Sequence, residues 1–193
     1  MPQITVFCGS TPGADPAFAA AARALGGRLV QRGLGLVYGG GKVGLMGIVA
    51  DAVLAAGGQV TGVMPRNLFP KEVGHPGLTE MRAVDSMHER KALMADLADG
   101  FIALPGGYGT LDEFCEILTW AQLGLHRKPC GLLNVAGYYD GFLSFLDHAS
   151  HEAFIRPQFR ALILDDTDPD RLLDRMAAYQ PPTVTRWLEQ DQR

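Results

Sequence analysis

The sequence lacks any run of 18 or more apolar residues, the length at which a helix becomes a candidate for crossing a membrane. Its first ten residues, MPQITVFCGS, hold no charged segment followed by a long apolar one, so the sequence predicts no secretory signal. We therefore expect no membrane partner. Hydrophobic residues make up 47% of the chain and charged residues 20%, which excludes intrinsic disorder for most of the chain.

Basic residues and cysteines are also few. The chain has 17 Lys and Arg against 21 Asp and Glu, and a net charge of −4 disfavours binding to nucleic acid through overall charge. A small anionic ligand would need a local donor site. The three cysteines, Cys8, Cys115 and Cys130, are an odd count, and each lies in an apolar run. They predict buried thiols in a reducing cytoplasm instead of a disulfide framework.

Two common kinds of catalytic centre have no sequence support. His148 and His151 form an HxxH pair, but no further ligands follow, so no metal site is predicted. The G-x-S-x-G turn that carries the serine of α/β-hydrolases is absent.

Short apolar runs alternate with longer helical patterns along the chain, which predicts β-α-β units and a parallel sheet covered on both faces. The fold class is a doubly wound, Rossmann-like α/β domain over residues 1–180, with a C-terminal tail at 181–193. Residues 66–78 are expected to form a loop. Strands are expected at residues 4–8, 34–38, 60–64, 81–84, 101–104, 131–135 and 162–164, and helices at 17–31, 44–56, 86–98, 110–123, 138–148 and 168–178.

The chain has 24 glycines, and two clusters of them fall at predicted strand ends, where ligands of such folds bind. The first cluster, VYGGGKVGLMG at 37–47, contains G-x-G-x-x-G. The next strand ends without the acid of a dinucleotide site, and Lys42 is not followed by the Ser or Thr of a P-loop. A phosphate-binding loop and a tight turn with close helix packing both remain open.

The second cluster, PGGYGTLDE at 105–113, also joins a strand to a helix. Thr110 and Glu113 have the spacing of a capping box. A cap does not account for glycine at positions 106, 107 and 109. Those glycines favour a loop whose backbone faces a bulky anion.

The third motif, SMHERK at 86–91, combines a Ser86–Glu89 capping box with an apolar stripe of Met87, Met94 and Leu97. Arg90 falls inside this stripe, and a guanidinium there must pair with an anion. A structural carboxylate and a ligand phosphate are equally compatible partners. Ser10, at the end of the first strand, could contact a phosphate or cap the next turn.

These three segments, VYGGGKVGLMG, SMHERK and PGGYGTLDE, resemble the signatures of the Lonely Guy (LOG) family of cytokinin-activating phosphoribohydrolases. The resemblance covers residues 4–165. It implies hydrolysis of the N-glycosidic bond of nucleoside 5′-monophosphates such as AMP, giving the free base and ribose 5-phosphate, without a cofactor. Many members carry the older label of lysine decarboxylase, which the chemistry of the family does not support.

The resemblance also implies roles for individual residues. Arg90 and Glu113 match the active-site arginine and the catalytic glutamate. The family often has Glu where this chain has Asp112, a departure that leaves Glu113 in place. The matching motifs, together with the strand-end loops, give these candidate substrate-binding residues: Ser10, Gly40, Gly41, Glu72, Lys91, Gly106, Gly107, Tyr108, Gly109, Thr110 and Thr119.

The expected chemistry follows from charge. Breaking a ribosyl C–N bond creates an oxocarbenium-like centre, which a carboxylate such as Glu113 can stabilise while it activates water. Arg90 is expected to hold the phosphate or to organise Glu113. The rival hypotheses are a non-catalytic nucleotide-binding module and a pyridoxal-phosphate decarboxylase, in which Arg90 would lower the pKa of Lys91.

The helix predicted at 110–123 is apolar almost all round, so it needs cover on several sides. A single sheet covers one side only. LOG-like proteins are typically dimers, and we therefore expect a homodimer with both glycine loops near its interface.

Overall fold

A computed structural model of the chain describes residues 1–68 and 74–182. All ladders of its seven-stranded sheet are parallel, in the order β4-β3-β2-β1-β5-β6-β7. The strands are β1 (Gln3–Phe7), β2 (Gly35–Tyr38), β3 (Val60–Pro65), β4 (Glu80–Val84), β5 (Gly100–Ala103), β6 (Cys130–Leu133) and β7 (Ile163–Asp166). The expected doubly wound parallel fold is confirmed.

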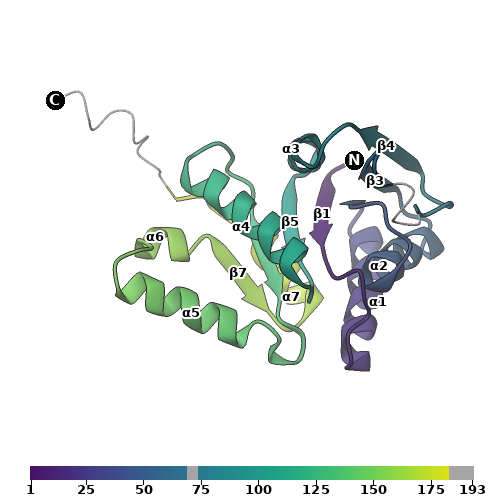
Figure 1. Cartoon of the computed structure of the whole chain (residues 1–193). Helices are drawn as coiled ribbons and strands as arrows, with labels where there is room; N and C mark the ends of the chain where they lie inside the picture. The colour runs from purple at the N-terminus through teal and green to yellow at the C-terminus, as the bar shows by residue number, and fades with distance from the viewer. Residues whose placement is uncertain (69–73, 183–193) are drawn as a thin grey trace.

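The helices, most of which connect successive strands, pack on both faces of the sheet (Figure 1). They are α1 (Pro16–Gln31), α2 (Gly44–Ala55), α3 (Met87–Leu97), α4 (Tyr108–Gln122), α5 (Asp140–His151), α6 (Pro157–Arg160) and α7 (Pro169–Ala177), with a 3₁₀ turn η1 (Val135–Gly137). The four-residue α6 and the turn η1 were not expected, because elements this short carry no periodic pattern. No helix in the described parts of the chain is long and apolar enough to cross a membrane.

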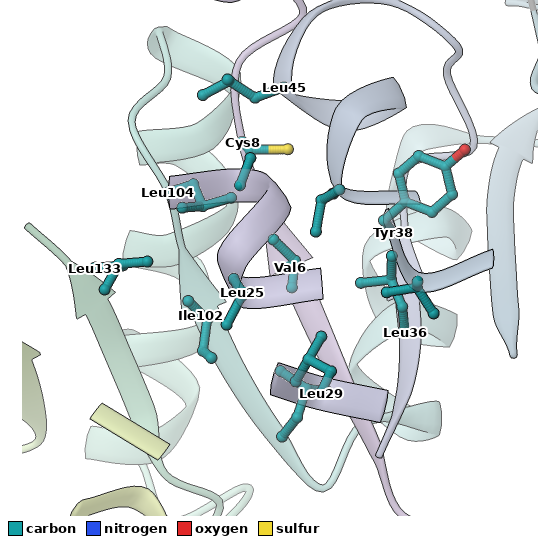
Figure 2. Packing of buried hydrophobic residues seen from close by; sticks show 14 of the residues in the cluster. Val6, Cys8, Leu25, Leu29, Leu36, Tyr38, Leu45, Ile102, Leu104 and Leu133 are labelled. Carbon is teal, nitrogen blue, oxygen red and sulfur yellow. The ribbon is translucent and has the colours of Figure 1, made fainter. Parts of the chain in front are cut away.

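Successive residues of β1 point to opposite faces of the sheet and enter two separate apolar clusters. Val6 packs with α1, α2 and α7 on one face, where Leu25 and Leu29 meet Leu36 and Ile102 (Figure 2). On the other face, Phe7 packs with Met94 of α3 and Phe114 of α4. The helices on both faces are thereby fixed to one rigid sheet.

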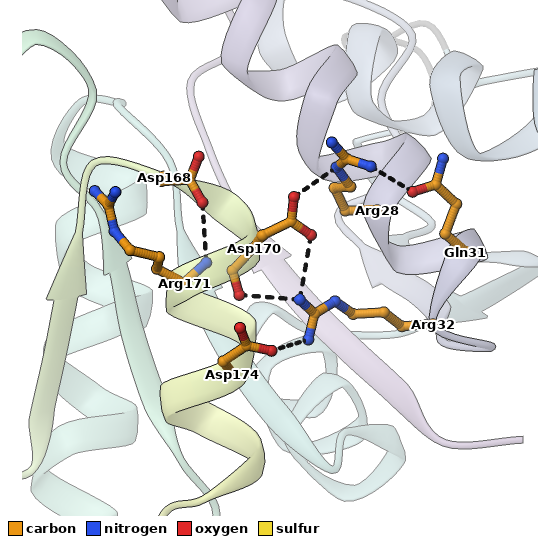
Figure 3. A network of polar contacts seen from close by, with 7 residues as sticks. All are labelled: Arg28, Gln31, Arg32, Asp168, Asp170, Arg171 and Asp174. Carbon is orange, nitrogen blue, oxygen red and sulfur yellow. Dashed lines mark hydrogen bonds and ion pairs between the residues drawn. The ribbon is translucent and has the colours of Figure 1, made fainter.

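Exposed ion pairs join α1 to α7 beside the apolar cluster that contains Val6 (Figure 3). Arg32, the C-cap of α1, contacts Asp174 at 2.6 Å and Asp170 at 3.2 Å, and Arg28 of α1 contacts Asp170 at 2.8 Å. Such pairs each contribute at most about 1 kcal/mol. The apolar contacts between the same helices and the sheet therefore dominate.

The chain reverses its winding direction between β1 and β5. From β1 it moves outward through β2 and β3 to the edge strand β4, and α3 then returns it to β5 on the other side of β1. In open parallel sheets, ligands bind in the crevice beyond the carboxyl ends of the strands at this switch point. The loops that follow β1 and β5 border that crevice.

Two local predictions are wrong. Cys8 and Cys130 are buried, but Cys115 is exposed, because it lies on the face of α4 that points away from the sheet. Met87, expected in the apolar stripe of α3, is 42% exposed as the first residue of that helix. The Ser86 cap is confirmed: its hydroxyl accepts from the Glu89 N–H. The Glu89 carboxylate accepts from Asp85, one residue before the expected partner.

Candidate active site

A cleft of about 230 Å³ lies at the switch point, beyond the carboxyl ends of β1 and β5. The loop after β1 and the first turns of α4 form its walls, and Arg90 of α3 and Met46 of α2 complete it. Its lining residues are Cys8, Gly9, Ser10, Met46, Arg90, Gly107, Tyr108, Gly109, Thr110 and Glu113. The cleft thus gathers seven of the predicted site residues from three separate parts of the chain.

Helix α4 begins two residues before the predicted start, and the predicted capping box is wrong. Gly107 is the N-cap, and no side chain of the described residues caps the helix. Thr110 is instead buried inside the first turn, against the backbone of Gly106. The glycines let the backbone enter the helix at Tyr108, so Thr110 already has helical geometry and cannot serve as a cap. The first N–H groups of α4, which have no partner within the helix, are left for the cleft.

The two glycine clusters differ in what surrounds them. At Gly107 and Gly109 an added Cβ would meet nothing within 4 Å among the described residues. Internal packing therefore does not require glycine at either position. Both residues line the cleft, where a side chain would occupy the space next to the helix N-terminus. This pattern favours a ligand that contacts the backbone.

The first glycine cluster, at 37–47, packs against other parts of the protein. The Gly40 carbonyl accepts from His75 N–H, and the Gly41 carbonyl accepts from the Tyr38 hydroxyl at 3.1 Å. A Cβ at Gly44 would overlap the backbone of Ser10, and Leu45 at the start of α2 donates its N–H to Gly9. The structure thus supports the tight turn with close packing. Gly40 and Gly41 are buried, and neither of them lines the cleft.

Arg90 lies in the first turn of α3 and is 7% exposed. Its Nη1 lies 3.9 Å from an Oε1 of Glu113, and it contacts the Met87 sulfur at 3.7 Å. Among the described residues, its Nε has no hydrogen-bond partner. A carboxylate therefore faces the guanidinium at long range, and one buried donor is left for a ligand or for water.

Glu113 projects from the second turn of α4, one turn beyond Gly109 on the same face of the helix. Its side chain is 13% exposed. Burial, with a smaller contribution from the charge of Glu113, raises the pKa of the Cys8 thiol well above its usual range. Cys8 therefore lines the cleft as a neutral thiol and is not a thiolate nucleophile.

Lys91 points away from the cleft, toward the outer side of α4. Its ammonium lies 2.9 Å from Glu116 and 3.2 Å from Asp112. The Glu116 carboxylate, and after it the Asp112 carboxylate, accepts from the Lys91 ammonium and thereby raises the pKa of Lys91. The expected lowering of this pKa by Arg90 is therefore wrong. A permanently charged, ion-paired lysine is poorly suited to forming a Schiff base.

The remaining predicted residues fall into three groups. Ser10 and Tyr108 line the cleft, and Asp15, not Ser10, caps α1. Thr119 lies three turns along α4 and donates its hydroxyl to the Cys115 carbonyl, so it is outside the cleft. Glu72 lies outside the described residues. Sequence reasoning missed Cys8 and Met46, although both sit in the strand-end segments that it examined.

Known proteins resemble this chain over most of its length. The family model described as "Possible lysine decarboxylase" matches residues 46–176. A probable cytokinin riboside 5′-monophosphate phosphoribohydrolase of Oryza sativa subsp. japonica is 53% identical over 93% of this chain and 73% of its own length. A cytokinin riboside 5′-monophosphate phosphoribohydrolase of Arabidopsis thaliana is 52% identical over 93% of this chain and 82% of its own length.

The chain belongs to the LOG family. Solved structures with lower identity share the fold of this LOG chain. The molybdenum cofactor binding protein of Rippkaea orientalis aligns with a TM-score of 0.69 at 22% identity, covering 92% of this chain and 96% of that one. The molybdenum cofactor carrier protein of Chlamydomonas reinhardtii aligns with a TM-score of 0.68 at 20% identity, covering 92% and 99%.

Proposed function

We propose that the protein is a phosphoribohydrolase that hydrolyses the N-glycosidic bond of nucleoside 5′-monophosphates carrying adenine or an isoprenoid-substituted adenine. One observation carries this proposal: the uncapped N-terminus of α4 lies in the same cleft as the buried Arg90 and the half-buried Glu113. The relatives named above support the same activity.

The first step is binding of the 5′-phosphate. Helix N-termini bind anions through their free N–H groups and the positive end of the helix dipole. Gly107 and Gly109 allow the phosphate to approach the backbone of α4. Glu113 lies about one helical turn, or about 5 Å, further along α4. A phosphate at the helix end therefore brings the ribose to the Glu113 carboxylate.

The second step is cleavage of the bond between C1′ and the base nitrogen. The electron pair of this bond leaves with the base, and C1′ becomes an oxocarbenium-like centre. Glu113 stabilises that centre and accepts a proton from the attacking water, whose oxygen bonds to C1′. The departing base takes up a proton from solvent, Glu113 releases the proton it accepted to solvent, and the other product is ribose 5-phosphate. Arg90 contacts the phosphate or orients Glu113.

Incubation of the protein with AMP is expected to release adenine and ribose 5-phosphate without added metal. Chromatography of the products from a panel of purine and isoprenoid-purine monophosphates measures the activity and the base preference together. If folded protein binds these nucleotides but releases no base from any of them, the non-catalytic binding module is the better description.

We further propose that the protein is a homodimer. Helix α5 has no buried residue, and its Phe145 is 63% exposed. A groove of about 160 Å³ between α4 and α5 is lined largely by apolar residues, among them Cys115, Leu118 and Phe142. A second copy would remove this exposed apolar surface from water.

Light scattering at micromolar concentration is expected to give twice the mass of the chain. Phe145→Asp should weaken the dimer, because it places a charge on the apolar face. Ala56→Asp, at an exposed position at the end of α2, is the matched control and should leave the mass unchanged. A monomer at micromolar concentration would refute the proposal.

We propose a cytoplasmic location on two grounds. Nucleoside monophosphates are intracellular metabolites, and Cys8, Cys115 and Cys130 are free thiols.

A further inference from the structure

We infer that Gly39 is a positioning residue for Arg90: the missing side chain at residue 39 leaves the space that the guanidinium occupies. This inference deepens the proposed function and rests on it for its activity readout. Gly39 directly follows β2 and does not line the cleft. Its role is therefore distinct from substrate contact.

The backbone does not explain why residue 39 is glycine. Gly40 has a φ of +83°, a conformation that other residues rarely adopt, but the φ of Gly39 lies outside that left-handed region. A left-handed φ therefore does not account for glycine at residue 39. The requirement for glycine at residue 39 must then come from its neighbours.

The neighbour that matters is Arg90. A Cβ at residue 39 would overlap Nη2 of Arg90 and would lie 3.2 Å from its Cζ. Met46, which also lines the cleft, is next, with its sulfur at 3.5 Å. No backbone atom is among these three nearest neighbours. The end of the Arg90 side chain therefore occupies the space that a Cβ of residue 39 would take.

The two amino groups of Arg90 face different neighbours. Nη2 lies against Gly39, and Nη1 lies 3.9 Å from Glu113. The guanidinium thus lies between the end of β2 and the Glu113 carboxylate. Displacement from Gly39 must change its position relative to Glu113, because both amino groups belong to one rigid plane. The side chain is only 9% exposed, so the surrounding protein limits the alternatives open to it.

A methyl group at residue 39 should therefore reduce activity more than stability. It would displace the end of a flexible side chain, which costs little in folding. A misplacement of about 1 Å in catalytic geometry can cost as much as about a hundredfold in rate. We expect Gly39→Ala to lower kcat for AMP at least tenfold, with a smaller change in KM.

The matched control is Gly100→Ala in β5. Gly100 is also buried, has no left-handed φ, and would press its new methyl against the flexible end of Met176 at 3.0 Å. It lies at the opposite end of the strand from the cleft. This variant should keep the wild-type kcat, and Gly39→Ala should melt no lower than it does.

The decisive test is a double-mutant cycle with Arg90→Lys, whose shorter and narrower side chain leaves room for a methyl at residue 39. Gly39→Ala should then cause no further loss in the Arg90→Lys background. The inference would be overturned if Gly39→Ala lowered kcat by the same factor in both backgrounds. It would also be overturned if the melting temperature of Gly39→Ala fell far enough to account for the lost activity.

Crystal structures of the wild type and of Gly39→Ala separate this inference from the proposed function. Arg90 should leave its place beside Glu113 in the variant, whether or not the wild type cleaves AMP. An unmoved guanidinium would refute the positioning role. An inactive wild type with a displaced Arg90 in the variant would refute the phosphoribohydrolase alone.

Discussion

Glu113→Gln is expected to lower kcat for AMP by on the order of a hundredfold or more while the protein stays folded. The neutral amide has the shape of the carboxylate, but it can neither stabilise an oxocarbenium-like centre nor accept a proton from water. Steady-state kinetics give the loss, and thermal melting shows whether the fold is retained.

Asp112→Asn is the matched control, because it makes the same isosteric change at the preceding residue. The Asp112 side chain is 63% exposed and faces Lys91 instead of the cleft. Its loss of turnover should be far smaller. Comparable losses at both positions would mean that the catalytic role is shared or wrongly assigned, and full turnover in Glu113→Gln would remove Glu113 from the mechanism.

Adenosine should be cleaved far more slowly than AMP, with kcat/KM lower by on the order of a hundredfold or more. Hydrogen bonds to charged groups contribute about 1.5–3 kcal/mol each, and about 1.4 kcal/mol corresponds to a factor of ten, so two such bonds suffice. The phosphate also fixes C1′ against Glu113. Its removal should therefore reduce kcat as well as affinity.

The measurement compares kcat/KM for adenosine and AMP under identical conditions. Inosine and its monophosphate form a second pair that differs by the same phosphate. Diphosphates and triphosphates should also be poor substrates, since a loop closed around a terminal phosphate leaves little room for further groups. Nearly equal values for adenosine and AMP would mean that the loop at 106–110 binds something other than the phosphate of the substrate.

The sheet and its helices could be predicted because each strand is a short apolar run and each long helix has clear periodicity. Apolar strands such as 101–104 are covered on both faces, so their pattern is continuous. The location of the candidate site could be predicted as well, because the loops that follow parallel strands lie at one edge of the sheet. Both Arg90 and Glu113 indeed meet at that edge.

The function of each glycine could not be predicted. Clusters 39–41 and 106–109 look alike in sequence, since both follow a strand and precede a helix. Only their surroundings distinguish them. Met46 fills the space beside the Cα of Gly41, whereas the space beside the Cα of Gly107 and of Gly109 is open. The start of α4 was misplaced for a related reason, because a capping box and a threonine buried in the first turn have the same spacing.

The direction of a long side chain was a further limit. Lys91 follows Arg90 in sequence, and adjacent helical residues point about 100° apart. That rotation brings Lys91 to Asp112 and Glu116, outside the cleft. The sequence predicts that both Arg90 and Lys91 lie on one helix. The carboxylates that pair with Lys91 belong to α4, whose orientation relative to α3 depends on tertiary packing.

The central place of β1 has a consequence for how the protein is made. β1 pairs with β2, where Gln3 lies opposite Gly35, and with β5, where Ile4 lies opposite Gly100. On the ribosome, the second partner emerges only after α1, α2 and α3 have been synthesised. Until then one edge of β1 is open to pairing with another nascent chain. The cleft includes residues of α4, which follows β5, so it is complete only when β5 and α4 have joined β1. A nucleotide that binds there favours the assembled domain over a half-assembled one.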